Sequence, residues 1–265
     1  MTRVGRALCL SELRERTRDR WVIVISVLFA LLASAVSLYG QSASSAAGAL
    51  TGPSLVTLAS LFVPLVALAL GYDAIVGERE RNTLGLLLSL PVSRAEVVIA
   101  KFVGRSLALA LAVLVGLGAA MLVAGDGEAR TLASLIGPTL LLGLAFVSIG
   151  MLVSAISSRQ SIAISLVVVL WFLLVFFYDL GILGLLVATD GDVSVDVVQG
   201  LVVANPAGLY RLQLVESLSG ARALSDLGVS DALPGAGTVA ALWALWIAGP
   251  LGLSALVLSL GRAFR

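Results

Sequence analysis

Apolar runs of about twenty residues or more recur along this 265-residue chain, and they restrict its fold more than any other feature. A run of that length crosses a hydrocarbon core of about 30 Å as an α-helix, whereas the strands of a membrane barrel alternate polar and apolar residues. Only 12% of the residues are charged and 59% are hydrophobic, too few polar groups to cover a water-facing surface. We therefore expect an all-α polytopic membrane protein.

Residue types that are rare or missing exclude several kinds of chemistry. The chain has no histidine, one cysteine (Cys9) and one lysine (Lys101). Histidine acid–base catalysis, a Cys–His nucleophile and a His/Cys metal site therefore cannot be built from it. A phosphate-binding G-x-x-x-x-G-K-[ST] loop is excluded because Ala100 precedes the lysine. We expect a subunit that is not an enzyme and binds no cofactor or metal, with ATP and Mg held by a separate ATPase chain.

Polar stretches divide the chain into a short N-terminal segment and six spans. Residues 1–20 carry six arginines with apolar residues at near-helical spacing, which predicts an amphipathic helix in the membrane interface. A cleaved signal peptide is the alternative for this start. Residues 21–265 are predicted to form one transmembrane domain with spans at 21–39, 54–72, 102–124, 132–156, 161–182 and 238–260.

The basic residues predict the orientation of the spans, because positive charge is retained on the cytoplasmic side. With both termini inside, all 17 basic residues except Arg130, Arg211 and Arg222 fall in inner segments. We expect a multi-pass protein of the plasma membrane with both termini cytoplasmic. Segment 73–101 then lies inside and the loop 189–237 lies outside.

The fifth apolar run, 161–188, is too long for one upright span. At 1.5 Å per residue its helix measures roughly 42 Å, against about 30 Å of hydrocarbon. We expect a break near Asp179, Gly181 and Gly184, followed by a short re-entrant piece. Asp179 is the acid within this run, so Asp179 and Tyr178 are candidates for an outer gate or exit. The alternative is that Asp179 lies at the outer interface, where water reaches it.

Small residues recur at every fourth position of the third span, at Gly104, Ala108, Ala112 and Gly116. This spacing lets helix backbones approach closely in lipid. The stripe serves either helix packing within the subunit or a dimer interface.

Segment 73–101 has a charged start, an apolar middle and a basic end after Pro91. That pattern predicts a short amphipathic helix at the inner face of the membrane. The helix is either a solvated connection or a docking element for a cytoplasmic partner, and the pattern favours docking.

The same segment resembles the signature of type-2 ABC transporter permeases. The residues that carry the resemblance are Asp73, Gly77, Glu78, Glu80, Thr83, Leu84, Leu87, Leu88, Pro91, Ser93, Arg94 and Lys101. The resemblance implies an interfacial N-terminal helix, six spans and a coupling helix that docks into an ATPase subunit. The residues that it assigns to ATPase coupling are Gly77, Glu78, Arg79, Glu80, Arg81, Thr83, Leu84, Pro91, Arg94 and Lys101.

Within that family the chain is similar to the membrane subunits of Nos-type transporters, which serve the maturation of nitrous oxide reductase. The similarity lies in residues 72–78, in residues 171–180 and in Asn205, Pro206, Tyr210 and Arg211. It implies an ATPase inside and a β-helical partner outside, docked through those last four residues, in the assembly of a copper–sulfur site. Gly208 departs from the Nos-type pattern, which has an acid there. A helix that rests flat on the outer leaflet is the alternative for this loop.

The composition limits what such a subunit passes to its partners. Without histidine, and with one cysteine, the chain cannot offer a conventional copper relay. We expect partners to hold the metal, while a homodimer of this chain, surrounded by lipid and binding no nucleic acid, passes on a sulfur species or mechanical work. The alternative is a general ABC exporter of a lipid, drug or ion. An intramembrane enzyme or a secondary transporter is more remote, because paired intramembrane carboxylates and an internal repeat are missing.

Overall fold

The computed structural model describes residues 3–17, 27, 30–31, 34, 51–89, 91–123, 126–214 and 234–260, and the regular secondary structure in these ranges is helical. Five stretches are long and apolar enough to cross a membrane: Val56–Glu80, Arg94–Leu122, Leu132–Ile156, Gln160–Ala188 and Ala236–Leu260. They coincide with predicted spans two to six, which confirms the all-α membrane architecture for the described part. The first predicted span, 21–39, lies outside the described residues except for residues 27, 30, 31 and 34, which are helical.

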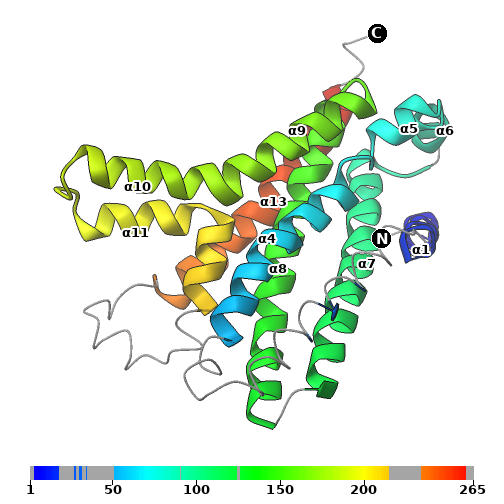
Figure 1. Cartoon of the computed structure of the whole chain (residues 1–265). Helices are drawn as coiled ribbons and strands as arrows, with labels where there is room; N and C mark the ends of the chain where they lie inside the picture. The colour runs from blue at the N-terminus through cyan, green and yellow to red at the C-terminus, as the bar shows by residue number, and fades with distance from the viewer. Residues whose placement is uncertain are drawn as a thin grey trace.

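The helices follow one another without intervening strands in the described ranges (Figure 1). Their bounds are α1 Arg3–Thr17, α4 Thr51–Gly71, α5 Val76–Glu80, α6 Leu84–Ser89, α7 Arg94–Val123, α8 Asp126–Ile156, α9 Gln160–Phe172, the π-helix η1 Leu173–Phe177, α10 Tyr178–Ala188, α11 Val195–Ala204 and α13 Ala236–Leu260. Residues 206–214 are also helical.

α8 is the central helix of the bundle and packs against α4, α7, α9 and α13. Within its candidate span, 72% of the most apolar stretch is buried inside the subunit. α4 and α8 cross at two glycines: a Cβ on Gly71 would lie 2.8 Å from the Cα of Gly150 and 2.7 Å from the carbonyl oxygen of Val147. The two backbones are therefore in direct contact, an arrangement that only glycine permits.

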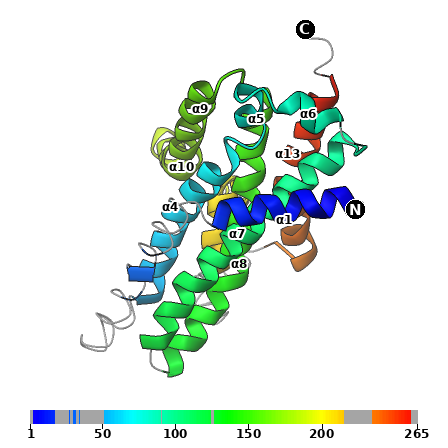
Figure 2. The same cartoon turned by 90° about the vertical axis from the view of Figure 1, so that its right-hand side faces the viewer.

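α1 lies crosswise over α7, as Figure 2 shows, and does not join the parallel bundle. The contact is close at Gly104, where a Cβ would lie 2.6 Å from the Cβ of Glu12 and 3.0 Å from the carbonyl oxygen of Cys9. The predicted amphipathic N-terminal segment is thus a helix, and a small residue of the third span seats it.

The expected break near Asp179 was wrong. α10 continues unbroken through Gly181 and Gly184 to Ala188, because glycine keeps its backbone hydrogen bonds in an apolar helix. The irregularity comes earlier, in the π-helix η1, where one extra residue per turn relaxes the backbone without ending the helix.

The chain reverses beyond α10 at residues 189–194, where Asp190 and Gly191 adopt positive φ angles of 50° and 80°. α11 then returns beside α10, and the two helices project from the bundle as a hairpin (Figure 1). Of the most apolar stretch of Gln160–Ala188, only 17% is buried inside the subunit. The structure thus combines a tightly packed core around α8 with a long helix that the subunit itself covers little.

Candidate functional site

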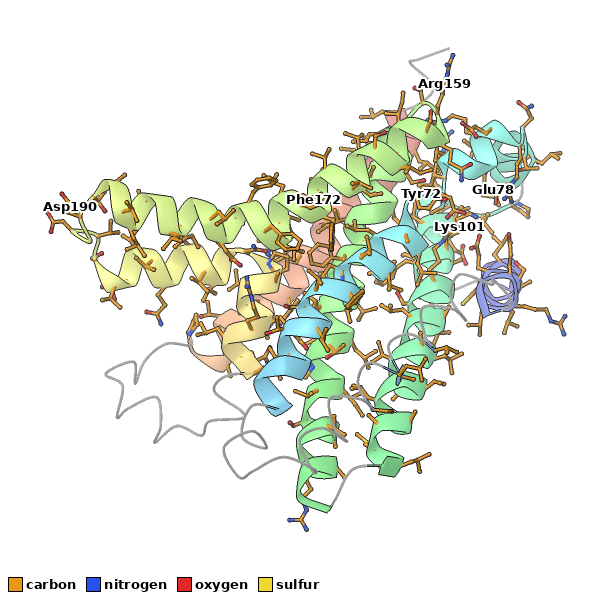
Figure 3. The ribbon with its side chains drawn as sticks, in the orientation of Figure 1. Tyr72, Glu78, Lys101, Arg159, Phe172 and Asp190 are labelled. Atoms are coloured by element: carbon orange, nitrogen blue, oxygen red, sulfur yellow. The ribbon has the colours of Figure 1, made fainter. Side chains whose placement is uncertain are left out.

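Five charged side chains gather where α1, α5 and α7 meet, and we call them the charge cluster: Glu12, Asp73, Glu78, Lys101 and Arg105. Lys101 and Arg105 are four residues apart on α7, so they lie on the same helix face. Lys101 binds Glu12 and lies 3.0 Å from Glu78. Arg105 lies 2.6 Å from Asp73 and 3.3 Å from Glu12. Figure 3 shows Glu78 and Lys101 close together at this junction.

Most of the charge cluster is removed from solvent. The side chains of Lys101 and Arg105 are 4% and 1% exposed, and that of Glu12 is 8% exposed. Charges at this depth are tolerated only when partners and hydrogen bonds compensate them, and here Arg105 also donates to the carbonyl oxygen of Leu70. Glu12 contacts both basic residues and thereby ties α1 to α7.

Two neighbouring residues of α5 bind the turn that connects α8 and α9. The Arg79 guanidinium donates to the carbonyl oxygens of Ser157 and, at 3.4 Å, of Ala155, at the end of α8. The Glu80 carboxylate accepts from the backbone N–H of Gln160, the first residue of α9, at 2.7 Å. The positively charged Arg79 therefore binds carbonyl oxygens at the carboxyl end of α8, and the negatively charged Glu80 binds an N–H at the amino end of α9. Both contacts match the partial charges of helix ends.

Two further basic residues of the segment bind other helices. Arg94, the first residue of α7, donates to the carbonyl oxygens of Leu258 and, at 3.2 Å, of Ser259, at the end of α13. Arg81 lies 3.8 Å from Glu15 of α1, in a pair whose side chains are both exposed. The charged residues after α4 thus contact the ends of several helices, so that α4, α7, α8, α9 and α13 are linked at what we call the α5–α6 end of the bundle.

α6 is the part of this segment that points away from the bundle (Figure 1). Asn82, with a φ of 57°, turns the chain between α5 and α6. The Thr83 hydroxyl then bonds to the Glu78 carboxylate, which fixes the start of α6 to the charge cluster. Leu86 is 71% exposed, and Pro91, beyond the helix, is also exposed. Leu86 and Pro91 thus give this connection an exposed apolar tip.

The structure places the predicted coupling residues in two groups. Gly77 and Lys101 are buried, and Glu78, Thr83, Leu84 and Arg94 are half-buried, so these residues work mainly through contacts within the subunit. The exposed ones are Arg79, Glu80, Arg81 and Pro91, of which the first two also bind the α8–α9 turn.

The small-residue stripe of α7 faces the interior of the subunit. Gly104 lies under α1, and Ala108, Ala112 and Gly116 are buried as well. These positions serve packing within the subunit in this structure.

Asp179 and Arg211, which are distant in sequence, form an ion pair that we call the outer pair, after the side of the membrane predicted for it. The carboxylate lies 2.6 Å and 2.8 Å from two guanidinium nitrogens, a two-point contact. Their side chains are 40% and 34% exposed, respectively. Next to Asp179, the Tyr178 hydroxyl donates to the carbonyl oxygen of Leu201 at 2.8 Å. The pair therefore fastens α10 to the helix at 206–214.

Three of the four residues predicted to dock an outer partner are buried inside the subunit. Asn205, Pro206 and Tyr210 are buried inside the subunit, which leaves them no surface to offer, and Arg211 alone is half-exposed. Asn205 donates at 2.6 Å to the carbonyl oxygen of Leu174, within the π-helix. A side-chain amide thus satisfies a carbonyl in the π-helical turn.

The structure explains why glycine occupies position 208. A Cβ at this position would lie 2.2 Å from the carbonyl oxygen of Val202, so the acid of the Nos-type pattern does not fit here without moving the backbone. Tyr210, two residues further along the chain, is buried. Its hydroxyl lies 3.1 Å from that of Thr139 on α8. Burial raises the pKa of the Tyr210 phenol, so it stays protonated.

Metal chemistry has little support in the described residues, where no group of three or more His, Cys, Asp and Glu side chains is arranged to hold an ion. Cys9 faces α7 and is half-buried. Burial, and secondly the charge of Glu12, raises the pKa of its thiol, so little nucleophilic thiolate is present near neutral pH.

Sequence reasoning did not single out Glu12 or Arg105, and gave Asp73 no role beyond the motif. A signal was available: two basic residues four positions apart at the start of a membrane span need acids on the same face. The partner in α1 could not be identified in this way. Nothing in the sequence says that α1 crosses over α7 and brings Glu12 to the two basic residues.

Residues 6–262 match the ABC-2 family transporter proteins. The chain therefore belongs to that family: it is the membrane-embedded permease subunit of an ABC transporter, without an ATPase domain, which implies a partner ATPase subunit.

Two relatives refine this assignment. The chain is 37% identical over 258 residues to a protein of Pseudomonas aeruginosa named "Probable ABC transporter permease protein NosY", covering 92% of this chain and 93% of the relative. It is 38% identical over 236 residues to a protein of the same name from Stutzerimonas stutzeri, covering 84% and 86%. The chain is therefore a NosY-like permease.

Proposed function

We propose that this chain is the membrane subunit of a Nos-type ABC transporter, which supports the maturation of a copper–sulfur enzyme outside the membrane. The coupling part of this proposal rests on the segment after α4, where charged and apolar residues make different contacts. The charged residues there hold helix ends together, while the apolar tip of α6 is left exposed. The Nos-type assignment rests on the similarity to NosY proteins over almost the whole chain.

The α5–α6 end of the bundle is the cytoplasmic end in this proposal. Arg79, Arg81, Arg94, Lys101 and Arg105 all lie there, as expected for an inner face. Six spans result when the predicted first span at 21–39 is added, and both termini are then cytoplasmic.

The ATPase subunit docks on α6 and drives this segment. Leu86 is the anchor, because it is the most exposed apolar side chain described there and a partner gains most by burying such a residue. The ATPase supplies ATP and Mg, and this chain supplies the mechanical connection to the spans.

The second copy of the chain packs against α9 and α10. α10 has no buried residue, and the aromatic rings of Trp171, Phe172 and Phe176 cluster on this exposed stretch, with centroids 4.8 Å to 5.7 Å apart. A helical stretch of 29 residues exceeds what a bilayer alone requires, so a protein surface is a better partner for it than lipid throughout.

The outer pair with Tyr178 forms the gate at the outer side. Breaking the pair releases α10 from the helix at 206–214, and both side chains are partly exposed in the subunit. A β-helical partner outside would contact the exposed turn at 189–194 rather than the buried Asn205, Pro206 and Tyr210.

The species passed to the outside is a sulfur compound, or none at all if the subunit delivers mechanical work. Metal is held by the partners. Stoichiometric copper binding by the purified chain would contradict this part of the proposal. A general ABC exporter of a lipid, drug or ion is the alternative and uses the same architecture.

A mild pull-down of the tagged chain from native membranes, followed by mass spectrometry, tests the whole assignment. Recovery of an ATPase together with an outer β-helical protein supports the Nos-type assembly. Recovery of an ATPase alone favours the general exporter, and recovery of neither from a well-solubilised sample contradicts the assignment of partners.

The docking surface is tested by Leu86→Asp, which should reduce ATPase recovery by at least about 30-fold if Leu86 is a hot spot. Leu10→Asp is the matched control, because Leu10 is an equally exposed leucine on α1 and should leave recovery unchanged. Equal recovery with Leu86→Asp and wild type would move the docking site away from α6.

A further inference from the structure

α5 contacts the α8–α9 turn through its backbone as well as its charged side chains. The hydroxyl of Ser154 in α8 accepts from the backbone N–H groups of Ile75 and Val76 at 2.8 Å and 3.0 Å, and both bonds are buried. The side-chain amide of Gln160 lies 3.3 Å from the Tyr72 hydroxyl. Together with the Arg79 and Glu80 contacts, these bonds join α5 to both helices that flank the turn.

The two helices that α5 joins differ in how firmly the subunit holds them. Of the most apolar stretch of each span, 72% is buried for Leu132–Ile156 and 17% for Gln160–Ala188. α8 is therefore fixed by the core, whereas α9 depends more on contacts at its ends. One of those contacts is the bond from the Gln160 N–H to Glu80 at 2.7 Å.

We propose that Arg79 and Glu80 are positioning residues that clamp the α8–α9 turn and transmit movement of α5 to α9. Arg79 holds the carboxyl end of the fixed helix, and Glu80 holds the amino end of the loosely packed one. A displacement of α5 by the ATPase then turns α9 and α10 against α8. This step rests on the proposed function, because it requires an ATPase that moves the segment after α4.

The clamp makes a prediction about charge order that an ordinary surface contact would not make. The exchange Arg79→Glu/Glu80→Arg keeps net charge and composition, yet it places an acid on carbonyl oxygens and a base on an N–H group. Because the partial charges of helix ends have fixed signs, the exchanged variant should be worse than Arg79→Ala/Glu80→Ala. Glu80→Gln retains an acceptor oxygen and should be close to wild type, and Arg130→Ala, an exposed arginine near the other end of α8, is the control.

The clamp itself is tested by hydrogen exchange on the full chain in nanodiscs, without any partner. Amides at residues 157–163 should exchange about three to ten times faster in the double alanine variant, and faster still in the exchanged variant. Arg130→Ala should not change them. Unchanged exchange at these amides in both double variants would overturn the clamp.

The transmission is tested in the permease–ATPase complex reconstituted with its outer partner and the outer enzyme, by comparing ATP hydrolysis with maturation of that enzyme. The double variants should keep ATPase recovery and hydrolysis, while maturation per ATP falls about tenfold or more. If the double variants exchange faster at residues 157–163 but keep wild-type maturation per ATP, the contacts of Arg79 and Glu80 are only structural, and the proposed transmission is overturned. Lost ATPase recovery would place Arg79 and Glu80 in the docking surface instead. If the wild type recovers no ATPase, the proposed function fails while the exchange experiment still decides the clamp.

Discussion

The charge cluster and the outer pair both join charged side chains of different helices, but they do so in different ways. Inside the α5–α6 end, three acids and two bases from three parts of the chain are joined, with Lys101 and Arg105 almost without exposure. In the outer pair, one acid meets one base and both are about a third exposed or more. Removing a base from a buried group of charges leaves an acid without full compensation, so the group should move together. A partly exposed pair costs less to open where water can replace the lost partner.

The largest expected effect is that of Arg105→Ala, which tests whether the charge cluster is a unit. Removal of Arg105 leaves Asp73 without its base and Glu12 with only Lys101. We expect a loss of about 3–5 kcal/mol in the free energy of unfolding, measured by steric trapping in bicelles. Arg105→Lys keeps the charge and should lose less. A loss below about 1 kcal/mol for Arg105→Ala would mean that water reaches the charge cluster and would remove the contrast.

A smaller effect is expected for Glu12→Gln, because the charge cluster has one acid more than it has bases. Lys101 keeps Glu78 and Arg105 keeps Asp73, so the cost should be about 1–3 kcal/mol. The main change is that α1 is held less firmly on α7.

Cys9 is the only cysteine in the chain and reports this change directly. In the wild type, burial and then the charge of Glu12 raise its pKa, so thiolate forms only at a pH above the ordinary value. Glu12→Gln removes the nearby charge and loosens the burial, so the pKa should fall toward its ordinary value. Maleimide labelling measured from pH 6 to 10 should therefore be faster at each pH below the wild-type pKa. Identical labelling profiles would show that Glu12 does not hold α1.

The smallest effect is expected for Asp179→Asn in the outer pair. A half-exposed ion pair contributes about 0.2–1 kcal/mol, so steric trapping should show a loss in that range. The pair of Arg81 and Glu15 is more exposed, so Arg81→Ala should show the smallest loss in the free energy of unfolding. A loss of about 3 kcal/mol or more for Asp179→Asn would place the outer pair in the hydrocarbon core and remove the contrast with the charge cluster.

The spans were predictable from the sequence because the bilayer imposes a length and an apolar composition, and five of the six predicted ranges agree with helices. Segment 73–101 was recognisable for a similar reason, since its change from charged to apolar sequence is local. What residues such as Arg79 and Arg94 bind could not be predicted in this way. Their partners are backbone carbonyls at the ends of α8 and α13, and a carbonyl leaves no signature in a sequence.

The errors on the outer side have physical causes too. The excess length of the fifth run was correctly noticed, but the run continues through a π-helix instead of breaking. A π-helix has no residue preference as strong as that of glycine for a turn. Asn205, Pro206 and Tyr210 were expected to dock an outer partner because of the similarity to Nos-type subunits, which does not say whether a residue is exposed. Here Asn205 bonds to the π-helix and Tyr210 to α8, contacts that only the assembled fold creates.

The contact of Arg94 with the end of α13 has a consequence for the order in which the protein is made. Its two acceptor carbonyls come 164 and 165 residues later in the chain. While the ribosome is still producing the last helix, Arg94 has no partner there, and the α5–α6 end remains open. A chain that stops before the last helix therefore lacks both acceptors, and the link between the start of α7 and the end of α13 forms only after the last helix has been made.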